Sequence, residues 1–523
     1  MTAEQASLPG GGGPGLAYAS RRGHWVLAAT VLGSAVASID ATVVGIALPA
    51  IGRDFHTGLA ALQWVVTAYT LALAGLLLVA GALGDRYGRR RFFVVGVIWF
   101  AAASLLCGLA PDVRTLIAAR ALQGVGAALL TPGSLAILEA SFVPDDRGRA
   151  IGAWSGLSGV GTAIGPFLGG WLIQSASWRW IFAINLPVAA VVVAVAARHV
   201  PESRDPQSPE RVDLLGGVLV TLGLVGLTYG LIEGPSRGWT DPVVLGSLLL
   251  GGLLLGCFVL WERRAKAPVL PLDLFASTRF NATNAVTFVL YGALGGALFL
   301  VPVQLQQVSG YTALEAGVSL LPLTVVMLLL SARSGALASR IGPRLQMSVG
   351  PVLVGCGIAL FVRVGTHADY VTHVLPAVLV LALGLATTVA PLTATALAAA
   401  PARHVGAASA VNNDVARAAG LIAVAVLPAA AGLSGSDYLR PERFSAGFDT
   451  ACLISSALCV LAGVLAAVTI RNPARPERAG RPGAAGAGQP LHCALDAPPA
   501  GRATRRTDGR GRPPRASGPP PEG

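Results

Sequence analysis

Lysine is almost absent from this chain of 523 residues: Lys266 is the only one, and it stands in no phosphate-binding loop. A Walker-type ATPase holds nucleotide phosphates with such a lysine, so ATP hydrolysis by this chain is excluded. The six cysteines show no metal-ligand spacing, so we expect no metal site. The string G-x-S-x-G at 234–238 lies in a short loop without a partner histidine, and we treat it as chance. We therefore expect neither an enzyme nor a bound cofactor.

Charged residues are scarce as well. They make up 12% of the chain, whereas 54% of the residues are hydrophobic and the mean hydropathy is +0.65. Apolar runs of roughly 20 residues, the length that a helix needs to cross a bilayer, recur fourteen times between Trp25 and Ile470. The first run is too long for a cleaved signal peptide and lacks a small-residue cleavage site. The sequence predicts an all-α integral membrane protein with 14 transmembrane helices.

Basic residues gather in the loops on one side of the predicted membrane. The opposite loops hold only scattered arginines such as Arg53, Arg114, Arg237 and Arg363. By the positive-inside rule the basic side is cytoplasmic, and an even number of spans places both termini there. We expect a multi-pass protein of the cell membrane. The basic residues on the cytoplasmic side are Arg21, Arg22, Arg86, Arg89, Arg90, Arg91, Arg147, Arg149, Arg204, Arg211, Arg263, Arg264, Lys266, Arg340 and Arg344.

A glycine-broken, arginine-rich turn runs from Gly81 to Arg91 after the second apolar run. A diluted copy, from Gly335 to Arg344, follows a later run. The chain therefore looks like two related halves. Related membrane halves around a central site are the usual build of a secondary transporter, in which one half rocks against the other.

Beyond Ile470 the composition changes abruptly to Arg, Pro, Gly and Ala. Residues 471–523 contain ten arginines and four acidic residues, which gives +6, half of the formal net charge of +12. No apolar or aromatic anchor interrupts the segment, so we expect a disordered, solvated tail that binds no nucleic acid. A tether to anionic lipid is the alternative interpretation.

One carboxylate is predicted well inside a span. Asp40 lies in the first apolar run, whereas all seven histidines lie in loops, at span ends or in the tail. A charge at membrane depth is costly and is by default a functional residue. The helical rise places Asp40 and Arg120 at similar depth, so we expect them to make contact, as a coupling site or as a structural pair. Gln123, one turn after Arg120, and Thr42 are further candidates for the proton and substrate pathway.

Small residues recur at helical spacing in the fifth run. They allow another helix to approach closely, and the proline among them loosens the backbone ladder. Plain helix packing is one interpretation, but the Gly-Pro and Gly-Gly pairs favour a bending or sliding surface between the halves. The residues are Gly161, Gly165, Pro166, Gly169 and Gly170.

Taken together, these runs resemble the major facilitator superfamily, and specifically its fourteen-span drug:proton antiporter branch. The runs that carry the resemblance are Asp40 to Pro49, Gly81 to Arg91, Arg120 to Ala128, Gly161 to Gly170, Trp178 to Pro187 and Gln306 to Pro322. The resemblance implies a cytoplasmic segment (1–24), a six-helix bundle (25–198), a linker (199–212), two inserted helices (213–262), a linker (263–280), a second six-helix bundle (281–470) and the tail (471–523).

The resemblance also implies a cytoplasmic gating relay of Asp85 and Arg89, with Glu139 as acidic partner and with Gly81 and Gly88 in the motif. The remaining arginines of this loop serve topology alone.

The sequence departs from the family in two places. Gly45 stands where the family usually has Asn, which removes a polar group near Asp40. Ser339 stands in the second loop where the first loop has Asp85. The second departure predicts that the relay operates mainly in the N-terminal half.

Polar residues gather at the inner part of the thirteenth span, and they are Asn412, Asn413, Asp414 and Arg417. They line the pathway in one interpretation. In the other, which we favour, Asp414 and Arg417 simply pair at positions i and i+3. The sequence leaves open whether Arg333 and Glu233 take part in transport.

We expect proton-driven export of drugs or toxic lipophilic small molecules, with cations among the candidates, by alternating access. In this mechanism Asp40 exchanges its proton against substrate. One alternative is a dedicated exporter of one endogenous metabolite or antibiotic. An alternative of another class is a membrane receptor or sensor, but the chain shows no folded output domain. The expected partners are the small molecule, protons and the lipid bilayer, and a monomer should suffice.

Overall fold

The computed structural model describes residues 15–472, except 207, 209–211, 266, 267, 269, 402–404 and 436. Nearly all of the predicted tail and most of the predicted N-terminal segment lie outside the described residues, as do Arg211 and Lys266. Fourteen helices in the described part are long and apolar enough to span a membrane, which confirms the predicted number.

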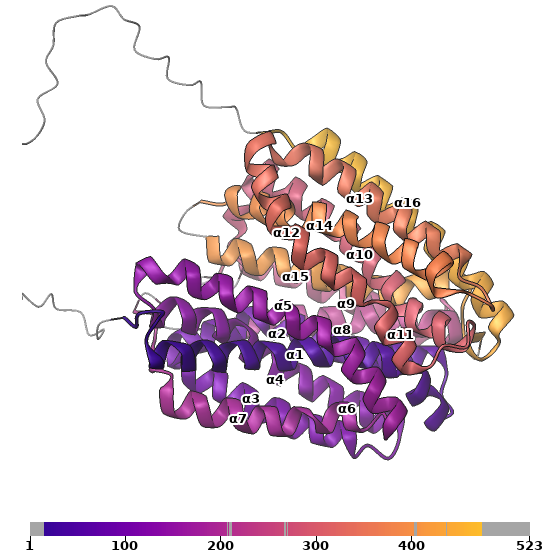
Figure 1. Cartoon of the computed structure of the whole chain (residues 1–523), viewed down its shortest axis with the longest axis horizontal. Coiled ribbons are helices and arrows are strands. Elements are labelled where there is room, and N and C mark those ends of the chain that lie inside the picture. The colour runs from indigo at the N-terminus through magenta and orange to yellow at the C-terminus, as the bar shows by residue number, and fades with distance from the viewer. Residues whose placement is uncertain are drawn as a thin grey trace, which may run out of the picture. The chain divides into compact units, whose positions relative to one another are not determined.

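The first seven helices form the N-terminal half, coloured from indigo to magenta in Figure 1. α6 and α7 are two parts of one span. The helices are α1 (Arg21–Asp54), α2 (Leu59–Tyr87), α3 (Arg89–Gly108), α4 (Val113–Ser141), α5 (Pro144–Ser175), α6 (Trp180–Ala183) and α7 (Asn185–His199).

Two inserted helices follow, α8 (Leu214–Arg237) and α9 (Pro242–Glu262). They pack against each other, and α8 also contacts α2 and α15, one from each half. An inserted pair that contacts both halves matches the predicted architecture of two six-helix bundles with two extra helices.

The C-terminal half is coloured from salmon red through orange to yellow in Figure 1. α11 and α12 form one span, and short turns extend α13 and precede α14. The helices are α10 (Thr278–Gln307), α11 (Ala313–Ser319), α12 (Leu321–Ile341), α13 (Pro343–Leu360), α14 (Leu375–Ala398), α15 (Val405–Ala430) and α16 (Pro441–Thr469). The shorter turns are η1 (Leu272–Ala276), η2 (Phe361–Arg363), η3 (Tyr370–Val374) and η5 (Asp437–Leu439).

The duplicated loop repeats one backbone geometry in both halves. α2 ends at Tyr87, and the next residue, Gly88, has a φ angle of 128°. α12 ends at Ile341, and Gly342 has a φ angle of 87°. A residue with a Cβ atom is strained at such angles, whereas glycine adopts them readily. The glycines therefore mark the same sharp turn in each half.

Hydrogen bonds join the two halves at one end. The Nε2 atom of Gln63 in α2 donates to the carbonyl of Val424 in α15 over 2.6 Å. The Nε2 atom of Gln306 in α10 donates to the carbonyl of Ile46 in α1 over 2.9 Å. Pro428 lacks the N–H group that would otherwise bond to Val424 within α15. Gln63 thus satisfies a carbonyl that its own helix leaves free.

Candidate functional site

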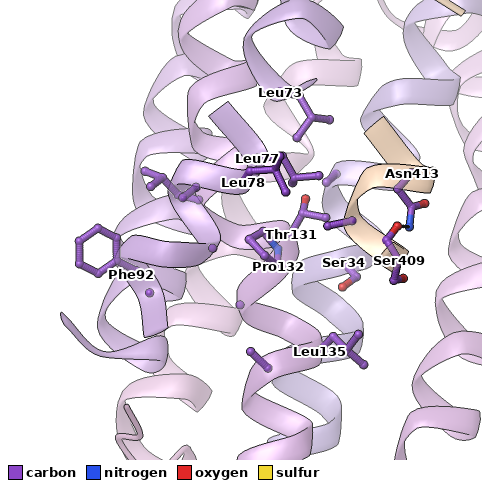
Figure 2. Close-up of a pocket in the computed structure, with 18 of the residues that line it drawn as sticks. Ser34, Leu73, Leu77, Leu78, Phe92, Thr131, Pro132, Leu135, Ser409 and Asn413 are labelled. Carbon is purple, nitrogen blue, oxygen red and sulfur yellow. Dashed lines mark hydrogen bonds between the residues drawn. The ribbon is translucent and has the colours of Figure 1, made fainter. Parts of the chain in front are cut away.

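A cavity of about 800 Å³ lies between the N-terminal half and α15. Figure 2 shows Leu73 and Leu77 on one side of it and Asn413 of α15 on the other. The cavity reaches Asp85, at the end of α2 opposite to Gln63, and we name the two ends of the molecule after these residues. The halves are therefore joined at the Gln63 end and separated by the cavity towards the Asp85 end. Its volume suits a drug-sized molecule.

Asp40 and Arg120 form a buried ion pair, with each side chain only 1% exposed. The Arg120 Nη1 atom donates to Asp40 Oδ2 over 2.5 Å. Asp40 Oδ1 accepts hydrogen bonds from Gln123 Nε2 at 2.8 Å and from Asn185 Nδ2 at 3.2 Å. A buried ion pair is tolerated only when further hydrogen bonds satisfy its remaining polar atoms. The predicted contact between Asp40 and Arg120 is confirmed. Gln123 bonds to both residues, because it donates to Asp40 and accepts from Arg120.

Tyr69 separates this ion pair from the cavity. The Cζ atom of Arg120 lies 4.3 Å from the centroid of the Tyr69 ring, which is a cation–π contact. Tyr69 and Thr42 line the cavity, whereas Asp40 and Arg120 are not among its lining residues. A molecule in the cavity therefore contacts the Tyr69 ring and not the ion pair itself, and the ring contacts Arg120.

The predicted relay residues lie at the Asp85 end. Arg89 Nε donates to Asp85 Oδ1 over 2.7 Å, across the turn between α2 and α3. Arg89 also donates to the carbonyl of Ala136 in α4, so this arginine of α3 contacts both α2 and α4. Glu139 and Gly81 line the same end of the cavity. In the described part of the chain, no hydrogen bond or ion pair joins Glu139 to Arg89, so its role as acidic partner stays a prediction.

The glycines of α5 face α1 and α11. Three of them, spaced four residues apart, form one helix face against α1. A Cβ atom placed there would meet Ala35, Thr42 and Val43 at Gly161, Gly165 and Gly169, respectively. Gly170 borders the carbonyl of Ala313 in α11, and the carbonyl of Pro166 borders Gly317. The small residues thus allow α5 to approach helices of both halves, and a sliding role stays a prediction.

Asn412 and Asn413 differ in their surroundings. Asn412 is buried, and its Nδ2 atom donates to Asn284 Oδ1 and to Thr287 Oγ1, both at 3.0 Å. Asn413 lines the cavity and donates only to a carbonyl of its own helix. The first is a packing contact between α15 and α10, whereas the second faces the pathway.

The pair that we expected between Asp414 and Arg417 is not formed. Among the described residues no hydrogen bond or ion pair joins them, and the Asp414 Oδ1 and Arg417 Nε atoms are buried without a hydrogen-bond partner. Arg417 lines the cavity, whereas Asp414 does not, so their side chains diverge. Of the remaining candidates, Arg333 is exposed on α12, and Glu233 forms an ion pair with Arg237 away from the cavity.

Three polar residues have roles in the site that were not predicted from the sequence, and they are Asn185, Tyr69 and Gln63. Each is a polar residue within or beside an apolar run, which is the one signal that could have singled them out. Their partners lie on other helices, so only the packing reveals their roles. In the described part of the chain, no group of three His, Cys, Asp or Glu side chains is placed to hold a metal ion.

Known proteins share this arrangement. The model of the Major Facilitator Superfamily matches residues 30–425. A puromycin resistance protein of Streptomyces alboniger is 37% identical over 481 residues, which cover 89% of this chain and 94% of that protein. The multidrug resistance protein Stp of Mycobacterium tuberculosis is 36% identical over 408 residues, which cover 77% of this chain and 74% of that protein.

A solved structure shows the same fold. The POT family transporter PepTSo is similar with a TM-score of 0.64 at 14% sequence identity, over 86% of this chain and 97% of that one. At that identity the likeness concerns the fold alone. The family match and the two resistance proteins extend over most of the sequence, and the chain therefore belongs to the Major Facilitator Superfamily.

Proposed function

We propose that this protein exports drugs and other toxic lipophilic small molecules across the cytoplasmic membrane in exchange for protons. One observation carries the proposal: the carboxylate of Asp40 is buried inside a membrane-spanning helix, next to a drug-sized cavity. A charge at that depth is costly, which favours a functional role. The two relatives support the choice of cargo, because one is named for resistance to puromycin and the other for multidrug resistance.

The ion pair gives the exchange a physical basis. An ionised Asp40 holds Arg120 strongly, because the charges interact at low dielectric. Protonation of Asp40 replaces the ion pair by a weaker hydrogen bond. Arg120 then retains its contacts with Gln123 and with the carbonyl of Val65. Its charge then acts on the cavity through Tyr69, so the protonation state of Asp40 changes the electrostatic potential that a molecule in the cavity meets.

Alternating access requires the halves to separate at the Gln63 end and to approach at the Asp85 end. The hydrogen bonds that join the halves at the first end, which also include Leu59 to Gly435 and Tyr438 to Thr57, are few enough to break in each cycle. The glycine face of α5 supports a sliding movement against α1 and α11. The pair of Asp85 and Arg89 lies at the mouth that must close.

We also propose the orientation and organisation expected from the sequence. The Asp85 end faces the cytoplasm, because the arginine-rich loops lie there. Both termini are cytoplasmic, the domain boundaries follow the sequence analysis, and one copy of the chain suffices for transport. The protein is a transporter and not an enzyme.

Everted membrane vesicles with an acid interior test the proposal. A pH-sensitive dye reports proton release as cationic, anionic and neutral lipophilic compounds are added. We expect release with the parent protein and none with Asp40→Asn at equal expression. The matched control is Asp54→Asn, since Asp54 lies on the same helix but forms its ion pair with Arg179 at the surface. Full proton release from Asp40→Asn would refute the role of Asp40.

A second candidate function is export of one dedicated metabolite or antibiotic. It is favoured by the printed name of the Streptomyces relative, which mentions a single antibiotic. The same vesicle assay separates the two functions: response to a single compound of the panel, with no response to the others, supports the dedicated exporter.

A further inference from the structure

Arg417 is a charged residue of the cavity, and no hydrogen-bond or ion-pair partner for it is found among the described residues. It lies half-way along α15, and it faces the same cavity as Tyr69 and Leu73 of α2. Its Nε atom is buried and donates to no acceptor among the described residues. An arginine carries its charge at any physiological pH, and its five donors are arranged to meet a carboxylate. The buried Nε donor is costly to leave without an acceptor, and a ligand in the cavity can supply one.

The other charges of the cavity do not neutralise Arg417. Asp85 and Arg89 are paired with each other at the Asp85 end. Glu139 lies near the end of α4 at that same mouth, about four helical turns from Gly124, the residue of α4 that borders Tyr69. Asp40 is held by Arg120 and does not line the cavity. The deep part of the cavity is therefore positively charged.

Asp414, one turn before Arg417 on α15, does not neutralise the arginine by pairing with it. The two residues are near neighbours on the helix surface, yet no ion pair forms, and Asp414 is not a lining residue. An ionised Asp414 lowers the positive potential at Arg417, but it does not occupy the guanidinium donors. The donors stay available to a molecule in the cavity.

We propose that Arg417 binds an anionic group of the transported molecule, such as a carboxylate or an ionised enol or phenol. This inference rests on the proposed export function and specifies its substrate class as lipophilic anions. The apolar body of the molecule packs against leucines of α2 and α4, which line the same cavity as Arg417. A permanent cation is disfavoured, because it meets the unpaired guanidinium at low dielectric.

Binding to the purified, full-length protein tests this inference without requiring transport. The probes are pyrenebutyrate and the matching pyrenebutyl-trimethylammonium, which share an apolar body and differ in the sign of charge. We expect pyrenebutyrate to bind and the cation to bind at least tenfold more weakly. Arg417→Gln should weaken pyrenebutyrate binding about tenfold to a hundredfold, the range of a charge-assisted hydrogen bond. Arg333→Gln on α12 is the matched control and should change nothing, since Arg333 does not line the cavity.

Two further variants keep the test decisive if Arg417→Gln folds poorly. Arg417→Lys preserves the charge and should retain part of the affinity. Asp414→Asn removes a neighbouring negative charge and should strengthen pyrenebutyrate binding several-fold, an effect opposite in sign to any loss of structure. Failure of pyrenebutyrate to bind, tighter binding of the cation, or equal affinity in Arg417→Gln would each overturn the inference.

The vesicle assay separates this inference from the proposed function. Arg417-dependent binding of pyrenebutyrate without proton release upholds the inference and refutes proton exchange. Proton release driven by cations, with no dependence on Arg417, upholds proton exchange and refutes the inference.

Discussion

The two halves share a fold but treat their buried polar groups in opposite ways. In the N-terminal half, Asp40 is surrounded by three donors, and both members of its ion pair are 1% exposed. In the C-terminal half, Asp414 and Arg417 lie three residues apart on α15, and neither has an ion-pair partner within the described part of the chain. The difference teaches that duplication preserves the backbone frame, whereas chemistry is specialised in each half. The N-terminal half holds a buried, fully hydrogen-bonded ion pair, which we call the closed site. The C-terminal half presents the cation Arg417 to the cavity, which we call the open site.

The duplicated loops show the same specialisation on a shared frame. In the first loop, Glu202 accepts the backbone N–H groups at the start of α3, at 3.1 and 3.2 Å. In the second loop, Asn472 accepts the N–H of Arg344 at 3.0 Å. Each acceptor stands three residues after the last helix of its half, α7 or α16. The position is repeated, but the negative charge occurs only in the first half, where it faces more arginines.

The largest effect is expected from breaking the closed ion pair. Arg120→Leu leaves Asp40 charged and buried without its partner, which costs about 3–5 kcal/mol of stability. Arg417→Leu is the matched change in the other half, and it should cost under about 1 kcal/mol, since no ion pair is lost. Thermal unfolding of both variants in one detergent measures the difference. Equal destabilisation would mean that the contrast between the halves is wrong.

A smaller effect is expected from removing one amide in each half. Asn185→Ala takes a donor from Asp40, and Asn412→Ala takes a donor from Asn284 and Thr287. Each removes a hydrogen bond from a buried polar group and should cost about 1–3 kcal/mol. We expect only Asn185→Ala to shift the pH at which proton release is half-maximal, because Asn185 stabilises the ionised form of Asp40. The pH profile in vesicles checks this, and an equal shift in Asn412→Ala would contradict it.

The smallest effect is expected at a feature that both halves share. Asp112 precedes α4 and Asp369 precedes the corresponding span, and each accepts the N–H of a threonine three residues later, at 2.9 Å. These hydrogen bonds hold the pKa of both carboxyls below the ordinary value of 3.8. The stabilisation is therefore present above that value and is lost as the pH falls through the lowered pKa.

Alanine variants measure this shared contribution. We expect Asp112→Ala and Asp369→Ala to lower the unfolding temperature slightly and by similar amounts near about pH 6, and the difference from the parent protein to shrink towards about pH 3. Both carboxyls are exposed, so salt should weaken the effect. A pH-independent difference would assign the loss to something other than the charged cap.

The ion pair of Asp40 and Arg120 was largely predictable from the sequence, whereas the arrangement of Asp414 and Arg417 was not. Asp40 and Arg120 stand out because charges are rare in apolar runs, and helical rise alone places them at one depth. Asn185 and Tyr69 escaped notice because their importance depends on which helices pack together. The spacing of Asp414 and Arg417 predicted a pair, and this was wrong, since spacing does not tell which side chain turns into a cavity.

The sequence by itself determined the class of protein, the number of spans, the duplication and the family. These follow from composition and local pattern, because a helix must bury about 20 apolar residues to cross a bilayer and a sharp turn requires glycine. Only the tertiary structure decided which half closes its charges, where the cavity lies, and that Gln63 and Gln306 join the halves. Those features depend on contacts between helices far apart in the chain, where the packing rather than the local pattern sets the partner of each polar group.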